Sequence, residues 1–247
     1  MRDFKRVVFG RALNLAEEDN SLYLYDVIGS DAWGGIDPTD VIAALKTFDG
    51  ADIDLRINSP GGYVTEGIAM YNALKEYDGK ITGYIDGLAA SAASFVAMAA
   101  DTLHVNEGAF VMVHEAHTAM AGNASALRKE ADLLEKMNGE IANIYAGRAS
   151  ATQDEWLAIM AGETWFTASE AVEHGIADSA DAPAVMKNVA FDVSSYKNAP
   201  EVLQERYSQA IEVPIVVEEQ EAEVVEEVTP TVSVEMRKRR LTLATIR

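Results

Sequence analysis

Cysteine is absent from the 247-residue chain, and basic residues are scarce beside acidic ones. Without cysteine the chain has no disulfide framework, no thiolate metal site and no cysteine nucleophile. The 20 Lys and Arg residues against 40 Asp and Glu residues give a formal net charge of -20 at pH 7. Because binding to nucleic-acid phosphates needs a basic footprint, this balance argues against a nucleic-acid partner and predicts a self-repelling polar surface.

Long hydrophobic runs are absent too. The longest apolar stretch, residues 87–100, is interrupted by serines and is shorter than the roughly 20 residues that a membrane span requires. The first ten residues include basic side chains but no sustained apolar segment and no small-residue cleavage site, so they do not resemble a secretory signal. We therefore expect a cytoplasmic protein with no membrane partner.

Extended and helical segments alternate along the chain, which predicts an α/β fold with a βα-repeating sheet packed against helices. Strands are expected at residues 52–58, 81–86 and 110–114. Helices are expected at residues 38–48, 64–77, 91–100, 123–147, 152–160 and 167–175. In the last of these, Thr167 opens a capping box with Glu170, and Gly175 ends the helix. Apolar residues recur at steps of three and four in the long helix that Asn123 caps, so this helix is expected to bury a stripe that starts at Leu127 and ends at Tyr145.

The composition changes near residue 190. We expect one catalytic domain over residues 1–190 and a carboxyl-terminal extension over residues 191–247. The extension offers one amphipathic helix at residues 200–211, and then residues 212–235 carry eight glutamates and no Lys or Arg. Such a segment lacks the aromatic residues to build a core, so we expect a disordered acidic tail before the basic cluster at residues 237–240.

A run of small residues, Gly87-Leu-Ala-Ala-Ser-Ala-Ala-Ser94, contains a candidate nucleophile. A serine hydroxyl needs a base within hydrogen-bond reach and donors for the oxyanion that its attack creates. Ser91 follows a predicted strand and precedes an alanine-rich helix, a position that would expose its hydroxyl and leave the Ala92 N–H without an intrahelical partner. From composition alone a serine in such a run packs a helix, and we assign that role to Ser94.

A glycine turn supplies the second candidate donor for an oxyanion. Gly61 and Gly62 follow the strand at residues 52–58 in the same way that Ser91 follows its own strand. Neighbouring strand ends would bring the Gly62 N–H to the same space as the Ala92 N–H. The serine segment does not match the Gly-x-Ser-x-Gly elbow of α/β-hydrolases, which argues against that family.

Four histidines are candidates for the base. His104 lies in a strand of alternating polarity, His117 lies in a loop-like segment, and His174 precedes Gly175, where a cation suits the helix dipole. Only His114 ends a hydrophobic strand, the usual place for a site residue in a βα sheet. The order of glycine turn, serine and histidine is therefore that of a serine hydrolase.

Four segments resemble, in order, the successive motifs of the ClpP serine peptidases: Asn58-Ser-Pro-Gly-Gly, Gly87-Leu-Ala-Ala-Ser91, Met112-Val-His114 and Glu170-Ala-Val-Glu-His-Gly-Ile-Ala-Asp178. The segment Glu163-Thr-Trp-Phe166 and the amino-terminal strands look most like the ClpP-like head maturation proteases of tailed bacteriophages and prophages. The resemblance implies the ClpP/crotonase-like spiral fold. It also implies that Ser91 is the nucleophile, His114 the general base, and the N–H groups of Gly62 and Ala92 the oxyanion hole.

The third member of a triad departs from the family pattern. The family has an Asp seven residues before the first Glu of its last motif, and the same count from Glu170 leads to Glu163. A Glu can orient an imidazole as an Asp does, with a slightly different backbone position. Asp178 and Asp181 are the alternative candidates for the acid of the triad. In that case Glu163 would be a loop carboxylate without a catalytic role.

The resemblance implies an endopeptidase that forms an acyl-enzyme without metal or cofactor and assembles as a homo-oligomeric ring, with the long helix stacking one ring on another. In the phage setting its substrates would be scaffold and capsid-precursor polypeptides within the immature head. The chain has no Walker-type motif, so any ATPase would be a separate chain.

Three other hypotheses remain open. A crotonase-like enzyme would use the paired N–H groups on a coenzyme A thioester, and a non-catalytic head assembly or scaffold protein would need no site. A Ser–Lys dyad with Lys129 as the amine is a mechanistic variant.

Overall fold

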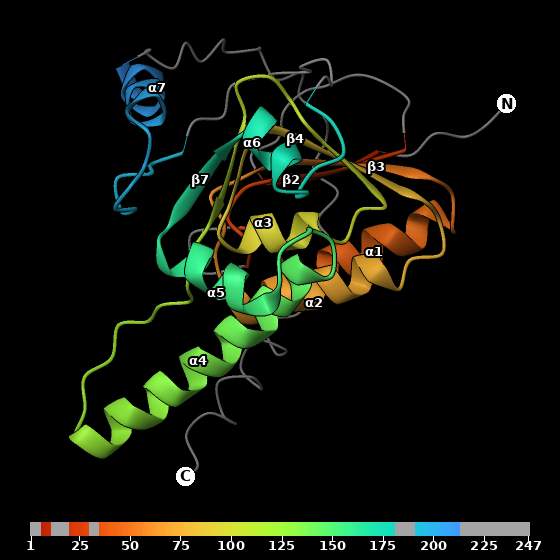
Figure 1. Cartoon of the computed structure of the whole chain (residues 1–247). Coiled ribbons are helices and arrows are strands. Elements are labelled where there is room, and N and C mark those ends of the chain that lie inside the picture. Colours follow the sequence, from red (N-terminus) through yellow and green to blue (C-terminus); the bar gives the residue numbers. More distant parts are fainter. Residues whose placement is uncertain (1–5, 11–19, 30–34, 181–190, 213–247) are drawn as a thin grey trace, which may run out of the picture. The chain divides into compact units, whose positions relative to one another are not determined.

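In the computed structural model, which describes residues 6–10, 20–29, 35–180 and 191–212, seven strands form one mixed sheet (Figure 1). The order along the sheet is β1-β2-β3-β4-β6-β7, and β5 also pairs with β4. All pairs are parallel except the antiparallel β6 and β7. The strands are β1 (Arg6–Gly10), β2 (Ser21–Tyr25), β3 (Ile53–Ser59), β4 (Ile81–Ala90), β5 (Thr102–Val105), β6 (Phe110–Val113) and β7 (Thr164–Thr167).

Helices connect the strands, and α1, α2 and α3 pack side by side against one face of the sheet (Figure 1). The main apolar core lies on this face. Among the described helices, none is long and apolar enough to cross a membrane. The helices are α1 (Pro38–Phe48), α2 (Val64–Lys75), α3 (Ala92–Ala97), α4 (Ala124–Ala146), α5 (Gln153–Ala161), α6 (Ala168–Glu173) and α7 (Glu201–Glu212).

Side-chain hydrogen bonds fix where the helices begin. Asn123 accepts from the Ala126 N–H at the start of α4, and Thr152 and Thr167 each form a complete capping box. Asp37 caps α1, and Pro38 at the first helical position needs no N–H donor there. The helix starts expected from the sequence at Asn123, Thr152 and Thr167 are therefore confirmed.

Strands β4 and β6 supply both faces of the sheet, because successive side chains point to opposite sides. Ala89 and Val111 lie in the main core, whereas Leu88, Ala90 and Met112 lie in a second apolar cluster. Val193, Ala199 and Leu203, from the segment before and within α7, complete this second cluster. The segment at residues 191–203 thus packs directly against the two strands that lead to Ser91 and His114.

The structure differs from the expectations at three elements. Strand β4 continues to Ala90 rather than ending at residue 86, and the antiparallel strand β7 was not expected. The stripe on α4 is buried only near its carboxyl end, at Ile141 and Tyr145 among others, while Leu127 is 44% exposed. The periodicity of α4 was correct, but the amino-terminal half of the helix extends away from the sheet and has no partner surface among the described residues (Figure 1).

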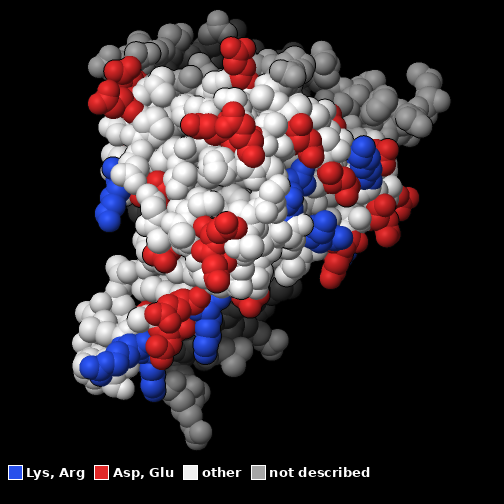
Figure 2. All heavy atoms as spheres, viewed as in Figure 1, with Lys and Arg blue, Asp and Glu red and all other residues white. Residues whose placement is uncertain are grey.

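All described residues belong to the unit Met1–Val213. The division at residue 190 stays a prediction about domains, although residues 191–212 lie in the same unit as the sheet, and α7 corresponds to the helix expected at residues 200–211. The acidic stretch from residue 213 onward, the basic cluster and Asp181 lie outside the described residues. Figure 2 shows acidic side chains spread over the visible face, with both signs of charge along α4.

Candidate active site

Ser91 lies at a sharp turn between β4 and α3. Its backbone has φ 52° and ψ -122°, a conformation that costs a non-glycine residue free energy and that occurs mainly where the surrounding structure enforces it. The Ser91 N–H donates to the Met112 carbonyl at 2.9 Å, which ties the turn to β6. This turn presents the hydroxyl at the carboxyl end of the sheet, as the run of small residues indicated.

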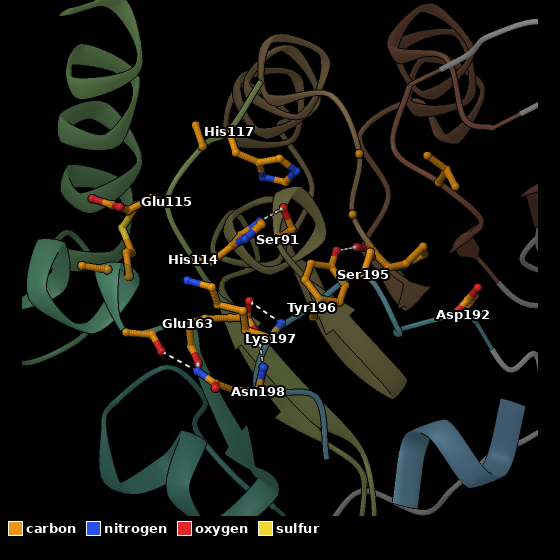
Figure 3. Close-up of a pocket in the computed structure, with 18 residues that line it drawn as sticks. Ser91, His114, Glu115, His117, Glu163, Asp192, Ser195, Tyr196, Lys197 and Asn198 are labelled. Carbon is orange, nitrogen blue, oxygen red and sulfur yellow. Dashed lines mark hydrogen bonds between the residues drawn. The ribbon is translucent and has the colours of Figure 1, made fainter. Parts of the chain in front are cut away.

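His114 follows β6 directly and reaches the serine. Its Nε2 lies 2.7 Å from the Ser91 Oγ (Figure 3). Because β4 and β6 are neighbours, with Ala90 paired to Met112, the ends of these two strands bring the side chains together. When Nδ1 carries the proton, Nε2 can accept the hydroxyl hydrogen, which is the arrangement that a general base requires.

Burial sets the protonation state of His114. Desolvation, reinforced by His117, lowers the pKa of His114 from 6.5 to about 4, and the negative charge of Glu163 opposes this shift. At neutral pH the imidazole is therefore neutral and able to accept a proton.

The glycine turn packs directly against the serine turn. Gly61 has φ 93°, and a Cβ on it would lie 2.5 Å from the Ala90 carbonyl oxygen and 2.6 Å from the Ser91 Cβ. Gly62 pairs with Ile28 through the Gly61 carbonyl and the Tyr63 N–H. In such a parallel bridge the Gly62 N–H points away from Ile28.

Gly62 also lines the cleft that contains Ser91. Ala92 is the first residue of α3, where an N–H has no intrahelical acceptor. The two N–H groups expected to hold an oxyanion therefore belong to turns that touch each other.

Glu163 enters the same cleft but does not bond to the histidine. Its φ of 47° is again unfavourable for a residue with a side chain. Its carboxylate accepts from the Asn198 N–H at 2.6 Å, from the Lys197 N–H at 3.0 Å and from the Trp165 Nε1 at 3.3 Å. Partial burial opposes ionisation, yet the three hydrogen bonds and the charge of His114 together hold the pKa of Glu163 below its ordinary value. Glu163 thus makes no direct bond to His114, and its negative charge raises the pKa of the imidazole.

The other candidates lie elsewhere or have structural partners. His104 bonds to Ser179 and stacks on Tyr84, and His174 ends α6 against Phe166. Ser94 is buried and bonds to the Ser91 carbonyl and the Tyr145 hydroxyl. Two further alternatives are also placed: Asp178 accepts from the Leu103 N–H and Arg148, and Lys129 is exposed on α4.

His117 remains beside the site, with its ring 5.2 Å from that of His114. Among the described residues, no group of three or more His, Asp or Glu side chains is arranged to hold a metal ion.

The sequence reasoning missed one wall of the cleft. The cleft has a volume of about 840 Å³ and is lined by Ser91, His114 and Glu163 together with residues from the segment 192–198, which we call the strap (Figure 3). The strap residues at the cleft are Asp192, Ser195, Tyr196, Lys197 and Asn198. Nothing in the local pattern marks this segment, because its role depends on contacts with residues more than 30 positions away. The two aromatic residues Phe191 and Tyr196 are the signal that could have suggested a packed segment beyond residue 190.

Comparisons with known proteins show the family of the chain. The chain belongs to the Clp protease family, whose profile matches residues 39–182. The chain is 33% identical over 129 residues to the ATP-dependent Clp protease proteolytic subunit 1 of Leifsonia xyli subsp. xyli, an alignment that covers 51% of this chain and 66% of the relative. It is 31% identical over 129 residues to proteolytic subunit 2 of Tropheryma whipplei, with 51% and 72% covered. The chain thus spans about two thirds of the length of these relatives.

Proposed function

We propose that the protein is a serine endopeptidase that cleaves polypeptides through an acyl-enzyme. The observation that carries the proposal is the 2.7 Å contact between the His114 Nε2 and the Ser91 Oγ, at a strained turn beside two N–H groups. Serine, base and oxyanion donors are the three parts that acyl transfer requires. Membership of the Clp protease family supports the same class of reaction.

In the proposed mechanism, the Ser91 Oγ attacks the carbonyl carbon of the scissile peptide bond while its proton moves to the His114 Nε2. The N–H groups of Gly62 and Ala92 hold the oxyanion of the tetrahedral intermediate. The peptide C–N bond then breaks, and the leaving amine takes the proton from Nε2. Water adds to the acyl-enzyme, giving a proton to His114, and collapse of the second intermediate releases the carboxylic acid and restores the Ser91 hydroxyl.

Glu163 is the proposed acidic member of the site. Its charge favours the imidazolium that forms during each proton transfer, as the direction of its effect on the His114 pKa indicates. No metal or cofactor has a step in this mechanism.

The substrate, the assembly and the cellular setting are finer parts of the proposal. We infer ATP-independent action in a ring of identical subunits, in the cytoplasm or the phage prohead, on scaffold and capsid-precursor segments. The similarity of Glu163-Thr-Trp-Phe166 to head maturation proteases supports this setting. The exposed amino-terminal half of α4, with Leu127 and Leu133 open to solvent, supports contacts between subunits. Co-expression with a capsid precursor and its scaffold, followed by mass spectrometry of the products, tests the substrate.

Labelling with a fluorophosphonate probe tests the proposed reaction class. We expect a covalent adduct on Ser91 in the wild-type protein, located by peptide mass spectrometry, and no adduct in Ser91→Ala or His114→Ala. Ser179→Ala is the matched control, because Ser179 forms the other Ser–His contact of the described chain, 2.8 Å from the His104 Nδ1. This variant should label at the wild-type rate. A folded wild-type protein that forms no adduct would contradict the proposal.

A further inference from the structure

Within the described part of the chain, His114 lacks the usual orienting hydrogen bond. Its Nε2 contacts Ser91, but among the described residues no group accepts from its Nδ1, and Glu163 is engaged by the strap. An imidazole that is held at one atom only can rotate away from the serine, and a misplacement of about 1 Å can cost about 10²-fold in rate. Among the described residues, a restraint on the ring has to come from groups other than a carboxylate.

Two aromatic rings lie against the imidazole. The Tyr196 ring is 5.5 Å from that of His114 at an interplanar angle of 79°, and the His117 ring is 5.2 Å away at 66°. Both are edge-to-face geometries, which are favourable for aromatic pairs. Figure 3 shows both rings beside His114, with His117 above it and Tyr196 below and to the right.

Tyr196 is itself fixed at three points. Its hydroxyl donates to the Pro60 carbonyl at 2.7 Å, next to the glycine turn, and its ring packs edge-on against Trp165 at 5.7 Å. It also packs against the second apolar cluster, in which Val193 is buried. A ring with these anchors can hold a neighbour in place, because few rotamers remain open to it.

Glu163 fixes the strap immediately after Tyr196. Its two carboxylate oxygens accept from the N–H groups of the next two residues, Lys197 and Asn198. The Asn198 side chain in turn donates to the Gly162 carbonyl at 2.9 Å, so the strap and the segment that contains Glu163 hold each other. Hydrogen bonds to an ionised acceptor are stronger than neutral ones.

From these contacts we infer that Tyr196 is a positioning residue for His114, and that Glu163 orients the histidine through the strap and not by a direct bond. The inference rests on the proposed function, because it assigns how the base of that reaction is held. It replaces the hydrogen bond between acid and imidazole with a chain of contacts from Glu163 through residues 196–198 to the His114 ring.

The first test compares fluorophosphonate labelling rates of the full-length protein at pH 7. Tyr196→Ala should label about 10–100-fold more slowly than wild type, since the ring that restrains His114 is gone. Tyr196→Phe keeps the ring and should recover most of the rate. Tyr77→Ala is the matched control, because the Tyr77 hydroxyl also donates to a backbone carbonyl, that of Ala51, but lies away from the cleft. It should label at the wild-type rate.

The pH profile separates positioning from simple loss of stability. Tyr196→Ala lets water reach His114, so the pKa of the imidazole should rise from about 4 toward 6.5. Between pH 5 and 8 the labelling rate of the wild-type protein should not change through titration of His114. The labelling rate of the variant should decrease as the pH falls below about 6.5, because His114 is then protonated. If Tyr196→Ala does not fold, Tyr196→Leu keeps the apolar bulk without the ring, so it should show the same slowing with a smaller rise of the His114 pKa.

A double-mutant cycle decides how Glu163 acts. If it acts through the strap, Glu163→Ala and Tyr196→Ala each slow labelling, and the double variant is at most about threefold slower than the slower single variant. A direct acid would instead make Glu163→Gln about 10⁴-fold slower, as for an Asp→Asn change in a triad, and the two effects would multiply. Either that result or a Tyr196→Ala protein with the wild-type rate and profile overturns the inference. Absence of a wild-type adduct is a different outcome, which overturns the proposed function and the inference together.

Discussion

Two polar clusters are centred on strand β4 and on the turn that follows it, and they differ in how completely their ionisable groups are paired. The first, the Asp86 cluster, comprises Tyr25, Arg56, Asp86 and Asn106. The second, the Ser91 site, comprises Ser91, His114 and Glu163. Their central residues are five positions apart, and both clusters contain ionisable groups whose pKa values are shifted.

Every acceptor of the Asp86 carboxylate is used. One oxygen accepts from the Tyr25 hydroxyl at 2.5 Å and from the Arg56 Nε at 2.9 Å, and the other accepts from the Arg56 guanidinium and from the Asn106 amide at 2.7 Å. Asp86 is only 2% exposed, so burial raises its pKa although these donors act in the opposite direction. The carboxylate has no acceptor left for a further donor, and among the described residues the one atom of this cluster without a partner, the Asn106 Oδ1, is buried.

The Ser91 site leaves groups open beside a cleft. The Nδ1 of His114 has no acceptor among the described residues, the N–H groups of Gly62 and Ala92 belong to turns, and Ser91 holds an unfavourable backbone conformation. A shifted pKa alone therefore does not distinguish an active site from a structural ion pair. Strain and open hydrogen-bonding groups next to a cleft do distinguish the two.

The largest effect is expected for Asp86→Ala. Removal of the carboxylate leaves the Arg56 guanidinium buried without its counter-charge, which costs about 3–5 kcal/mol in the free energy of unfolding. Tyr25→Phe removes one donor only and should cost about 1 kcal/mol. Urea denaturation of both variants and of Ser91→Ala, which should be close to wild type in stability, measures the contrast. Equal stability of Asp86→Ala and Ser91→Ala would remove the distinction between the clusters.

Gly61→Ala should act on the site as well as on the fold. The added methyl group would meet the Ala90 carbonyl oxygen and the Ser91 Cβ, which forces the serine turn away from the Gly62 N–H. We expect fluorophosphonate labelling about 10²–10³-fold slower, the loss typical of an oxyanion donor. Gly50→Ala provides the control, because φ at Gly50 is also positive, at 75°, but its Cβ would meet only the Asp78 Cβ at 3.8 Å. It should lose stability and keep its labelling rate.

Acid pH should weaken the fold through His114. Its pKa is about 4 when folded and 6.5 in the unfolded chain, so between these values the unfolded state binds a proton that the folded state does not. Stability is therefore lost as pH falls from 6.5 toward 4, by about 2–3 kcal/mol for this group. Urea denaturation at pH 7 and pH 5 should show a smaller loss in His114→Asn than in wild type. Equal losses in the two proteins would mean that His114 is not the group responsible.

Local sequence features predicted most of the fold and the centre of the site. Caps at Asn123, Thr152 and Thr167 are decided within one helical turn, so the sequence alone locates them. The Ser91 and His114 positions follow from strand ends on neighbouring strands, which a βα alternation places together.

Long-range contacts account for what was missed. The role of Tyr196 depends on the Pro60 carbonyl, 136 residues earlier in the chain, and no local pattern encodes that contact. The two N–H groups that engage Glu163 lie at least 34 residues away from it, so the sequence count that selected Glu163 carried no information about its bonding partner. The prediction that α4 buries its whole apolar stripe was wrong for a related reason. Periodicity shows that a helix face is apolar, but it does not show whether this chain supplies the surface that covers it.

The smallest effect on labelling is expected for a substitution at Ser94. This serine lies close to the active site, but its hydroxyl is fully paired, as the Asp86 carboxylate is. Its hydroxyl lies 2.6 Å from the Ser91 carbonyl oxygen and 2.7 Å from the Tyr145 hydroxyl, all inside the core. Ser94→Ala leaves the Tyr145 hydroxyl without this partner and should cost about 1–2 kcal/mol, and addition of Tyr145→Phe should recover part of the loss because both polar groups are then gone. Labelling of Ser91 should stay within about threefold of wild type, since the two N–H groups and His114 are unchanged. A Ser94→Ala protein that folds normally but no longer labels would contradict this expectation. It would mean that the bond from Ser94 to the Ser91 carbonyl maintains the strained turn and that Ser94 is needed for catalysis.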